Sequence, residues 1–166
     1  MSCLLEKKLP FACTLLKADN SYVEFPLNQI TYALLVHNED PHNTSTSEEG
    51  TNLGRIEHKV NLILQMLGHM MQASTHVPDM SRLQLSADEI AWYLPEAKID
   101  QEYQLTLFLS EDFRLPLNLL VRVIRIESGW CHALIKHQHV DEQSIWEKWV
   151  FRQHRRHIAL ARAQTN

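Results

Sequence analysis

Histidine and cysteine side chains that could bind a metal lie close together in the last third of the chain. The sequence holds ten histidines, and the densest group of possible ligands is Cys131, His132, His137 and His139. A structural zinc ion takes four nitrogen or sulfur ligands in tetrahedral arrangement. The spacing of this group matches no common zinc pattern, and neighbours such as Cys131 and His132 fall on opposite faces of a strand. We therefore predict no metal site and expect surface or packing histidines.

A second group of reactive side chains is basic and lies near the C-terminus: Arg152, His154, Arg155, Arg156 and His157. Guanidinium groups bind phosphate well, so a basic helix at this position could contact RNA. The whole chain, however, carries a net charge of −4 and has a pI of about 6.2, and it has no aromatic RNA-binding motif. RNA binding is therefore an alternative, and a solvated helix end is the simpler interpretation.

Motifs for catalysis are missing from the sequence. It has no H-E-x-x-H, no G-x-S-x-G, no glycine-rich phosphate loop, and only four glycines. The three cysteines, Cys3, Cys13 and Cys131, are far apart and form no C-x-x-C pair, and no signal-like leader precedes them. No apolar run approaches the roughly 20 residues that span a bilayer. We predict a cytoplasmic protein that is not an enzyme and needs no cofactor.

Composition divides the chain at residues 37–52, HNEDPHNTSTSEEGTN, which contain no apolar side chain. Such a segment cannot join a core, so we predict a flexible loop. Residues 1–36 before it contain a strand-like run, FACTLL, followed by FPLNQITYALLV. Pro26 suits a first helical turn and the apolar residues after it follow helical spacing, although Ile, Thr, Tyr and Val also favour strands.

Residues 53–75 carry a heptad repeat. Six apolar residues are spaced 3, 4, 3, 4 and 3 apart: Leu53, Ile56, Val60, Ile63, Leu67 and Met70. Leu at position a with Ile at position d favours three or four helices, and further apolar residues at e and g widen the stripe beyond what one neighbour covers. We predict self-association, most simply as a tetramer. The alternative is a helix that packs on its own domain, because about two and a half heptads are short for a free coiled coil.

From about residue 81 the apolar pattern changes to a period of two. Five such runs, RLQLS, IAWYL, EYQLTLFL, PLNLLVRVIRI and WCHALIKHQ, are separated by short turns and predict about five antiparallel strands in a sandwich or small barrel. The last segment, VDEQSIWEKWVFRQHRRHIALARAQ, is acidic early and basic late, as the helix dipole favours. Its apolar beginning should cap the barrel, and its basic end should project beyond it.

Three features together resemble a PilZ domain, the bacterial receptor module for cyclic diguanylate (cyclic di-GMP). They are the small antiparallel barrel, the strand pair LQLSADEIAW with its D-x-S-x-x-G-like turn, and the final helix WVFRQHRRHIALAR. The resemblance covers roughly residues 80–160. The heptad segment before the barrel is similar to the PilZ variant of xanthomonads that tetramerises through added helices. The resemblance implies a fold that is mainly β with added helices: a barrel with its C-terminal helix over residues 80–166, and a heptad-repeat oligomerisation helix.

The resemblance also implies how a ligand would be bound. PilZ domains hold cyclic di-GMP with R-x-x-x-R before the barrel and D-x-S-x-x-G on the second and third strands. Aligning QLSADE with the second motif places Gln84 at the aspartate, Ser86 at the serine and Glu89 at the glycine. Glu89 brings negative charge to the position of an anionic ligand. The arginine motif is missing, because the first arginine of the chain, Arg55, lies inside the heptad segment.

We therefore predict a degenerate PilZ-domain protein that acts as an oligomeric interaction or regulatory module and does not bind cyclic di-GMP by the usual motifs. The alternatives are a weak or atypical cyclic di-GMP receptor that uses other arginines, and a basic-helix RNA-binding protein. The identity of a protein partner does not follow from the sequence. The predicted partner surface comprises Trp149, Phe151, Arg152, Arg155 and Arg156, with core packing as the alternative for Trp149.

Overall fold

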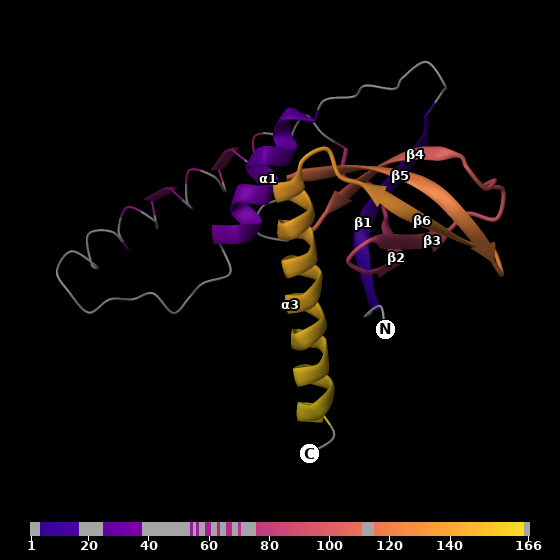
Figure 1. Cartoon of the computed structure of the whole chain (residues 1–166). Coiled ribbons are helices and arrows are strands. Elements are labelled where there is room, and N and C mark those ends of the chain that lie inside the picture. The colour runs from indigo at the N-terminus through magenta and orange to yellow at the C-terminus, as the bar shows by residue number, and fades with distance from the viewer. Residues whose placement is uncertain are drawn as a thin grey trace.

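The computed structural model describes residues 4–16, 25–37, 76–110 and 115–164, together with eight separate residues between 54 and 70. Within this part of the chain, six antiparallel strands close into a barrel in the order β1-β2-β3-β6-β5-β4, flanked by helices α1 and α3 (Figure 1). The elements are β1 Leu5–Leu15, α1 Pro26–His37, β2 Met80–Leu85, β3 Glu89–Tyr93, β4 Glu102–Phe108, β5 Pro116–Glu127, β6 Trp130–Lys136 and α3 Val140–Gln164.

The barrel needs a strand from the N-terminal segment. All five predicted strands after residue 80 are present, but β1 closes the barrel by pairing with β2 as far as Pro10 and with β4 from Phe11 onward. Pro10 lies where the strand changes partner, a position that tolerates its missing N–H group. The prediction of a barrel confined to residues 80–166, with residues 1–36 as a separate segment, is therefore wrong. Its cause is sequence distance, because local periodicity does not reveal a partner strand so far along the chain.

Helix α1 is docked on β5 by a side-chain amide. Asn28 Nδ2 donates a hydrogen bond to the carbonyl oxygen of Asn118 at 2.7 Å, and the Asn118 N–H donates to Asn28 Oδ1 at 2.9 Å. The pairing of β5 with β6 begins only at Leu120, so the Asn28 amide satisfies backbone groups for which β6 offers no partner. Tyr32 and Leu35 add buried apolar contacts to the same face of the helix.

Replacing Asn28 with alanine should lower the free energy of unfolding by about 2–3 kcal/mol, because a buried backbone donor and acceptor both lose their partner. Urea unfolding measures the difference. The matched control is Gln29→Ala, next along the helix and exposed, which should change stability by less than about 0.5 kcal/mol. Equal losses for the two variants would show that the Asn28 amide does not anchor α1.

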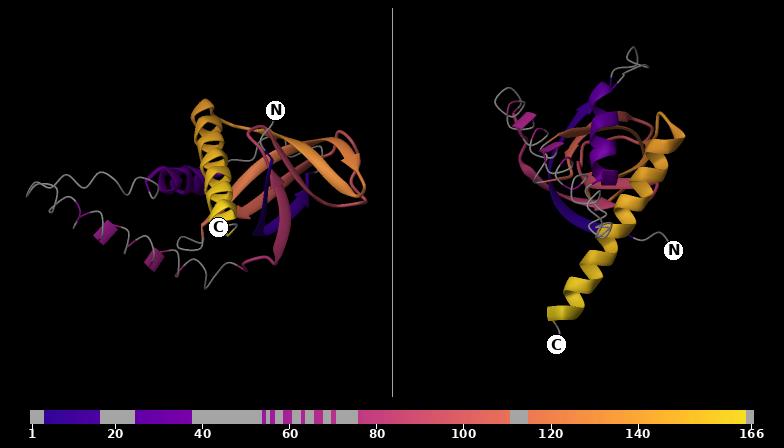
Figure 2. Two further views of the ribbon diagram at one scale, coloured as in Figure 1. Left: turned by 90° about the horizontal axis from the view of Figure 1, so that it is seen from below. Right: turned by 90° about the vertical axis from the view of Figure 1, so that its left-hand side faces the viewer.

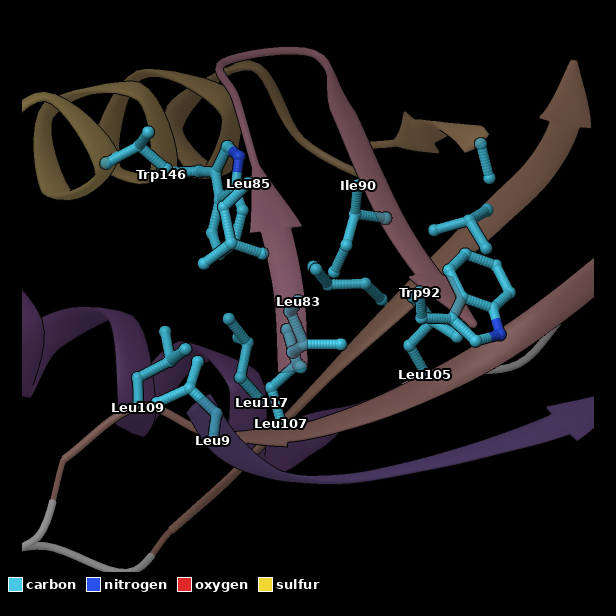
Figure 3. Close-up of a cluster of buried hydrophobic side chains, with 14 of the residues drawn as sticks. Leu9, Leu83, Leu85, Ile90, Trp92, Leu105, Leu107, Leu109, Leu117 and Trp146 are labelled. Atoms are coloured by element: carbon cyan, nitrogen blue, oxygen red, sulfur yellow. The ribbon is translucent and has the colours of Figure 1, made fainter. Parts of the chain in front are cut away.

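The hydrophobic core fills the barrel and is closed at one end by α3. Leu83, Ile90, Leu105 and Leu117 are fully buried, and Trp146 from α3 lies over Leu85 (Figure 3). This arrangement confirms that the apolar beginning of the C-terminal helix packs on the barrel. Beyond that region, α3 extends past the barrel toward the C-terminus (Figure 1).

Candidate functional site

Ser86, which the sequence comparison aligns with the serine of the PilZ ligand motif, closes the turn between β2 and β3. The Ser86 N–H donates to the Glu89 carbonyl at 2.8 Å, and Ser86 Oγ accepts a hydrogen bond from the Glu89 N–H at 2.9 Å. Ala87 and Asp88 between them have no positive φ angle. Two-residue hairpin turns usually need glycine or asparagine for a positive φ. Here the serine hydroxyl takes over the acceptor role in the turn, which explains how the sequence turns without either residue.

Because the Ser86 hydroxyl accepts the Glu89 N–H, the Ser86 carbonyl oxygen can accept a hydrogen bond from elsewhere in the chain. Trp146 Nε1 on α3 donates to this oxygen at 2.9 Å, and Ser86 itself is only 1% exposed. A buried serine with both its hydroxyl and its carbonyl engaged by the fold presents no free polar atom to a dinucleotide. Ser86 therefore has a structural role in this chain.

Substituting Ser86 with alanine should lower the free energy of unfolding by about 1–3 kcal/mol, since the Glu89 N–H would lose its acceptor in a part-buried turn. Chemical denaturation followed by tryptophan fluorescence is a suitable measurement. Asp88→Ala is the control, because the Asp88 side chain is exposed in the same turn. A loss no larger than that of the control would remove the structural role assigned to the hydroxyl.

The other two motif positions face outward, and each contacts a charged group of the barrel. Gln84 Nε2 donates to Glu6 Oε1 at 3.3 Å, and Glu6 also forms an ion pair with Arg82. Glu89 Oε2 lies 3.5 Å from Arg125 Nη2. Both arginines beside the motif thus already have a carboxylate partner, and the Arg82 guanidinium holds the pKa of Glu6 below its usual value.

Arg125 reaches this surface because β5 has a bulge. The register with β6 shifts between Val123 and Arg125, which places Arg125 opposite His132 on the outer face. Arg125 Nη2 lies 3.0 Å from His132 Nδ1, and Arg125 Nε lies 3.3 Å from Glu127 Oε1. A guanidinium only donates, so Nδ1 must accept and the imidazole is neutral. Burial, and then the Arg125 charge, lower the pKa of His132 accordingly. No motif in the sequence indicates this network.

Cys131 and His132 lie on opposite faces of β6, as the sequence predicts. Cys131 is fully buried in the barrel, where burial raises the pKa of its thiol to about 11, and His132 contacts Arg125 on the outer face. A thiol with this pKa is protonated at neutral pH and is a poor metal ligand or nucleophile. In the described ranges of the chain, no group of three or more histidine, cysteine or acidic residues is arranged to hold a metal ion.

The heptad stripe is only partly described. Leu53 lies outside the described residues, and so do most residues between the stripe positions, so a continuous helix over residues 53–75 stays a prediction. The other five stripe residues have helical backbone: Ile56, Val60, Ile63, Leu67 and Met70. Their side chains are between 47% and 71% exposed. In the single chain these five residues are exposed, and the association of the stripe with other copies stays a prediction.

The predicted partner surface on α3 needs one correction. Trp149 is only 2% exposed and stacks on Trp146 with ring centroids 5.5 Å apart, so its assignment to an exposed contact surface is wrong and core packing is right. Lys7 Nζ covers the same ring at 5.3 Å from its centroid. Phe151 is 57% exposed, with the Arg155 guanidinium 5.8 Å from its ring centroid. Arg152 is half-buried and Arg156 is exposed.

None of the helices in the described ranges combines the length and the apolar character needed to cross a membrane. No protein-family model and no curated protein sequence matches the chain. Among solved structures, a pathogenic protein from Xanthomonas campestris, described as a tetrameric PilZ domain self-assembled through an unusual helical bundle, matches with a TM-score of 0.76. The two chains are 21% identical, and the match covers 95% of this chain and 91% of that one.

At this identity the match establishes the fold. The chain is a PilZ-like antiparallel β-barrel with a C-terminal helix, mainly β with added helices, as the resemblance in the sequence predicts. The ligand, the assembly and the partners of this chain do not follow from the fold alone, because one fold supports many functions.

Proposed function

We propose that this chain is a degenerate PilZ-domain protein, a regulatory module that acts through protein contacts and does not bind cyclic di-GMP at its β2–β3 surface. One observation carries the proposal: the surviving motif serine is buried and engaged by Trp146, while Glu89 stands at the glycine position and pairs with Arg125. The proposal assigns no catalytic activity and no cofactor to the chain.

Electrostatics support the absence of ligand binding. Cyclic di-GMP carries two phosphates, and its recognition needs cations that are free to pair with them. Near a protein surface, two like charges about 4 Å apart repel by roughly 1–4 kcal/mol, so Glu89 would both repel the ligand and hold Arg125 away from it. Arg82 is likewise already paired with a carboxylate, because it forms an ion pair with Glu6.

The module is proposed to work as a tetramer. Support comes from the exposed apolar side chains of the heptad stripe, which would lie in water in a monomer, and from the helical-bundle tetramer described for the Xanthomonas neighbour. Burial of such a stripe between copies is the usual way in which a heptad repeat is stabilised. The module is proposed to act in the cytoplasm.

Calorimetric titration with cyclic di-GMP should give no saturable heat in the micromolar range. The double variant Gln84→Asp, Glu89→Gly should also stay silent, because rebuilding the turn motif does not supply the missing arginine pair. A PilZ domain that carries both motifs serves as the positive control. Saturable binding by the unmodified chain would instead establish the alternative, an atypical receptor that uses other arginines.

A further inference from the structure

The last turns of α3 form a helical overhang, defined as residues 155–164. Every residue from 155 to 163 is exposed, whereas the first half of the helix buries Trp146, Trp149 and Val150 against the barrel. Figure 1 and the right-hand view of Figure 2 show this end of α3 extending away from the barrel. These last turns contribute no buried side chain to the barrel core, so their exposed surface is open to another contact.

Positive charge is concentrated in the C-terminal stretch that begins at Lys148 and includes the overhang. From Lys148 to the C-terminus there are five lysines and arginines and no acidic residue. The remaining chain holds the other eleven basic residues and all 20 acidic ones, so a body of net charge −9 carries an end of net charge +5. Such an end attracts an anionic partner and steers its approach.

Apolar side chains lie on opposite sides of this basic helix end. Phe151 and Ile158 are seven residues apart and share one face, whereas Leu160 is nine residues from Phe151 and points the opposite way. Leu160 lies on the same face of the helix as Trp149, further toward the C-terminus, and is 64% exposed. A partner that covers these side chains must therefore contact the helix from two sides.

This geometry discriminates between possible partners. A flat anionic membrane would contact one face and leave either Ile158 or Leu160 in water. RNA would satisfy the arginines and leave the apolar side chains exposed. A second overhang would repel the first, since both are basic. An acidic protein groove satisfies both the charges and the two apolar faces, as in the helix-in-groove mode of recognition.

We propose that the α3 overhang is a docking element for a partner protein that encloses the helix in an acidic groove with apolar walls. The inference rests on the proposed function, because it names the kind of protein contact through which the module acts. Ile158 and Leu160 are the apolar anchors within the overhang, and Phe151, just before it, shares the face of Ile158. Arg155 and Arg156 supply the charge that the acidic rim recognises.

Calcium-loaded calmodulin, an acidic protein whose grooves enclose basic apolar helices, is a suitable probe of this surface. The full chain should bind it in the micromolar range by calorimetry and should not bind when calcium is chelated. Leu160→Asp and the double variant Arg155→Glu, Arg156→Glu should each weaken binding about tenfold or more. The charge-matched control is Lys8→Glu, Lys98→Glu, two exposed barrel positions, which should bind as the unmodified chain does.

Three results would overturn the proposal: no binding of calmodulin, equal binding by the Leu160→Asp variant, or retention on RNA or anionic vesicles in place of calmodulin. Light scattering of the Leu160→Asp variant adds a fourth, since a changed oligomeric state would make the overhang an interface between copies. The titration with cyclic di-GMP is independent of all of these. Failure of the overhang and failure of the proposed function are therefore distinguishable.

Discussion

Replacing Trp146 by alanine should lower the free energy of unfolding by about 3–5 kcal/mol, among the largest losses expected from a single substitution in the described part of the chain. The side chain is fully buried, stacks on Trp149 at an interplanar angle of 27°, and donates its indole N–H to the Ser86 carbonyl. Its loss would leave a cavity between α3 and the barrel and an unsatisfied carbonyl in the β2–β3 turn. Equilibrium unfolding in urea measures the change.

Two further variants separate the contributions of Trp146. Trp146→Phe keeps much of the buried volume but removes the hydrogen bond, so it should cost clearly less than Trp146→Ala and more than zero. Phe151→Ala, an exposed aromatic residue on the same helix, should change stability by less than about 0.5 kcal/mol. If Trp146→Ala cost no more than Phe151→Ala, α3 would not be held to the barrel through this side chain.

The position of Trp146 also bears on the structural role of Ser86. The serine position of the motif lies in the turn that receives the indole, so Ser86 is needed for the fold whether or not a ligand binds. Gln84 and Glu89 have no such role in the core, because both side chains lie on the outer face.

Periodicity in the sequence predicts those parts of the fold whose partners are close along the chain. The five strands after residue 80 and the helix that begins near Asp141 all carry a clear local pattern, and each is present. β1 carries a weaker pattern that includes Pro10, and its partners β2 and β4 lie far along the chain, so its place in the barrel is a long-range property.

The sequence predicts which residue types occupy the candidate site, but it does not predict their contacts. Aligning QLSADE with the PilZ motif places Glu89 at the glycine position, but the alignment does not show that Arg125 pairs with this glutamate. That contact depends on the bulge in β5, which reverses the face on which the following residues lie. The burial of Trp149 could not be predicted for the same kind of reason. Helical spacing places Trp149 on one face of α3 but does not indicate which element covers that face.

Substituting Ile63 with aspartate should convert the assembled protein into monomers or make it insoluble. Ile63 is at the centre of the heptad stripe and is 55% exposed in the single chain, so burial of its side chain requires another copy. A carboxylate at this position would be buried without a partner in every chain of the assembly, at a cost of several kcal/mol per copy. Light scattering at tens of micromolar protein should give a tetramer for the unmodified chain.

The matched control is Lys59→Asp, which introduces the same carboxylate in the same segment but at an exposed position beside the stripe. It should leave the tetramer largely intact, because its charge stays in water. The stripe is short, with about two and a half heptads, so its own association is marginal and one buried charge is enough to abolish it. A monomeric unmodified chain, or equal effects of the two aspartates, would mean that the stripe does not assemble the protein.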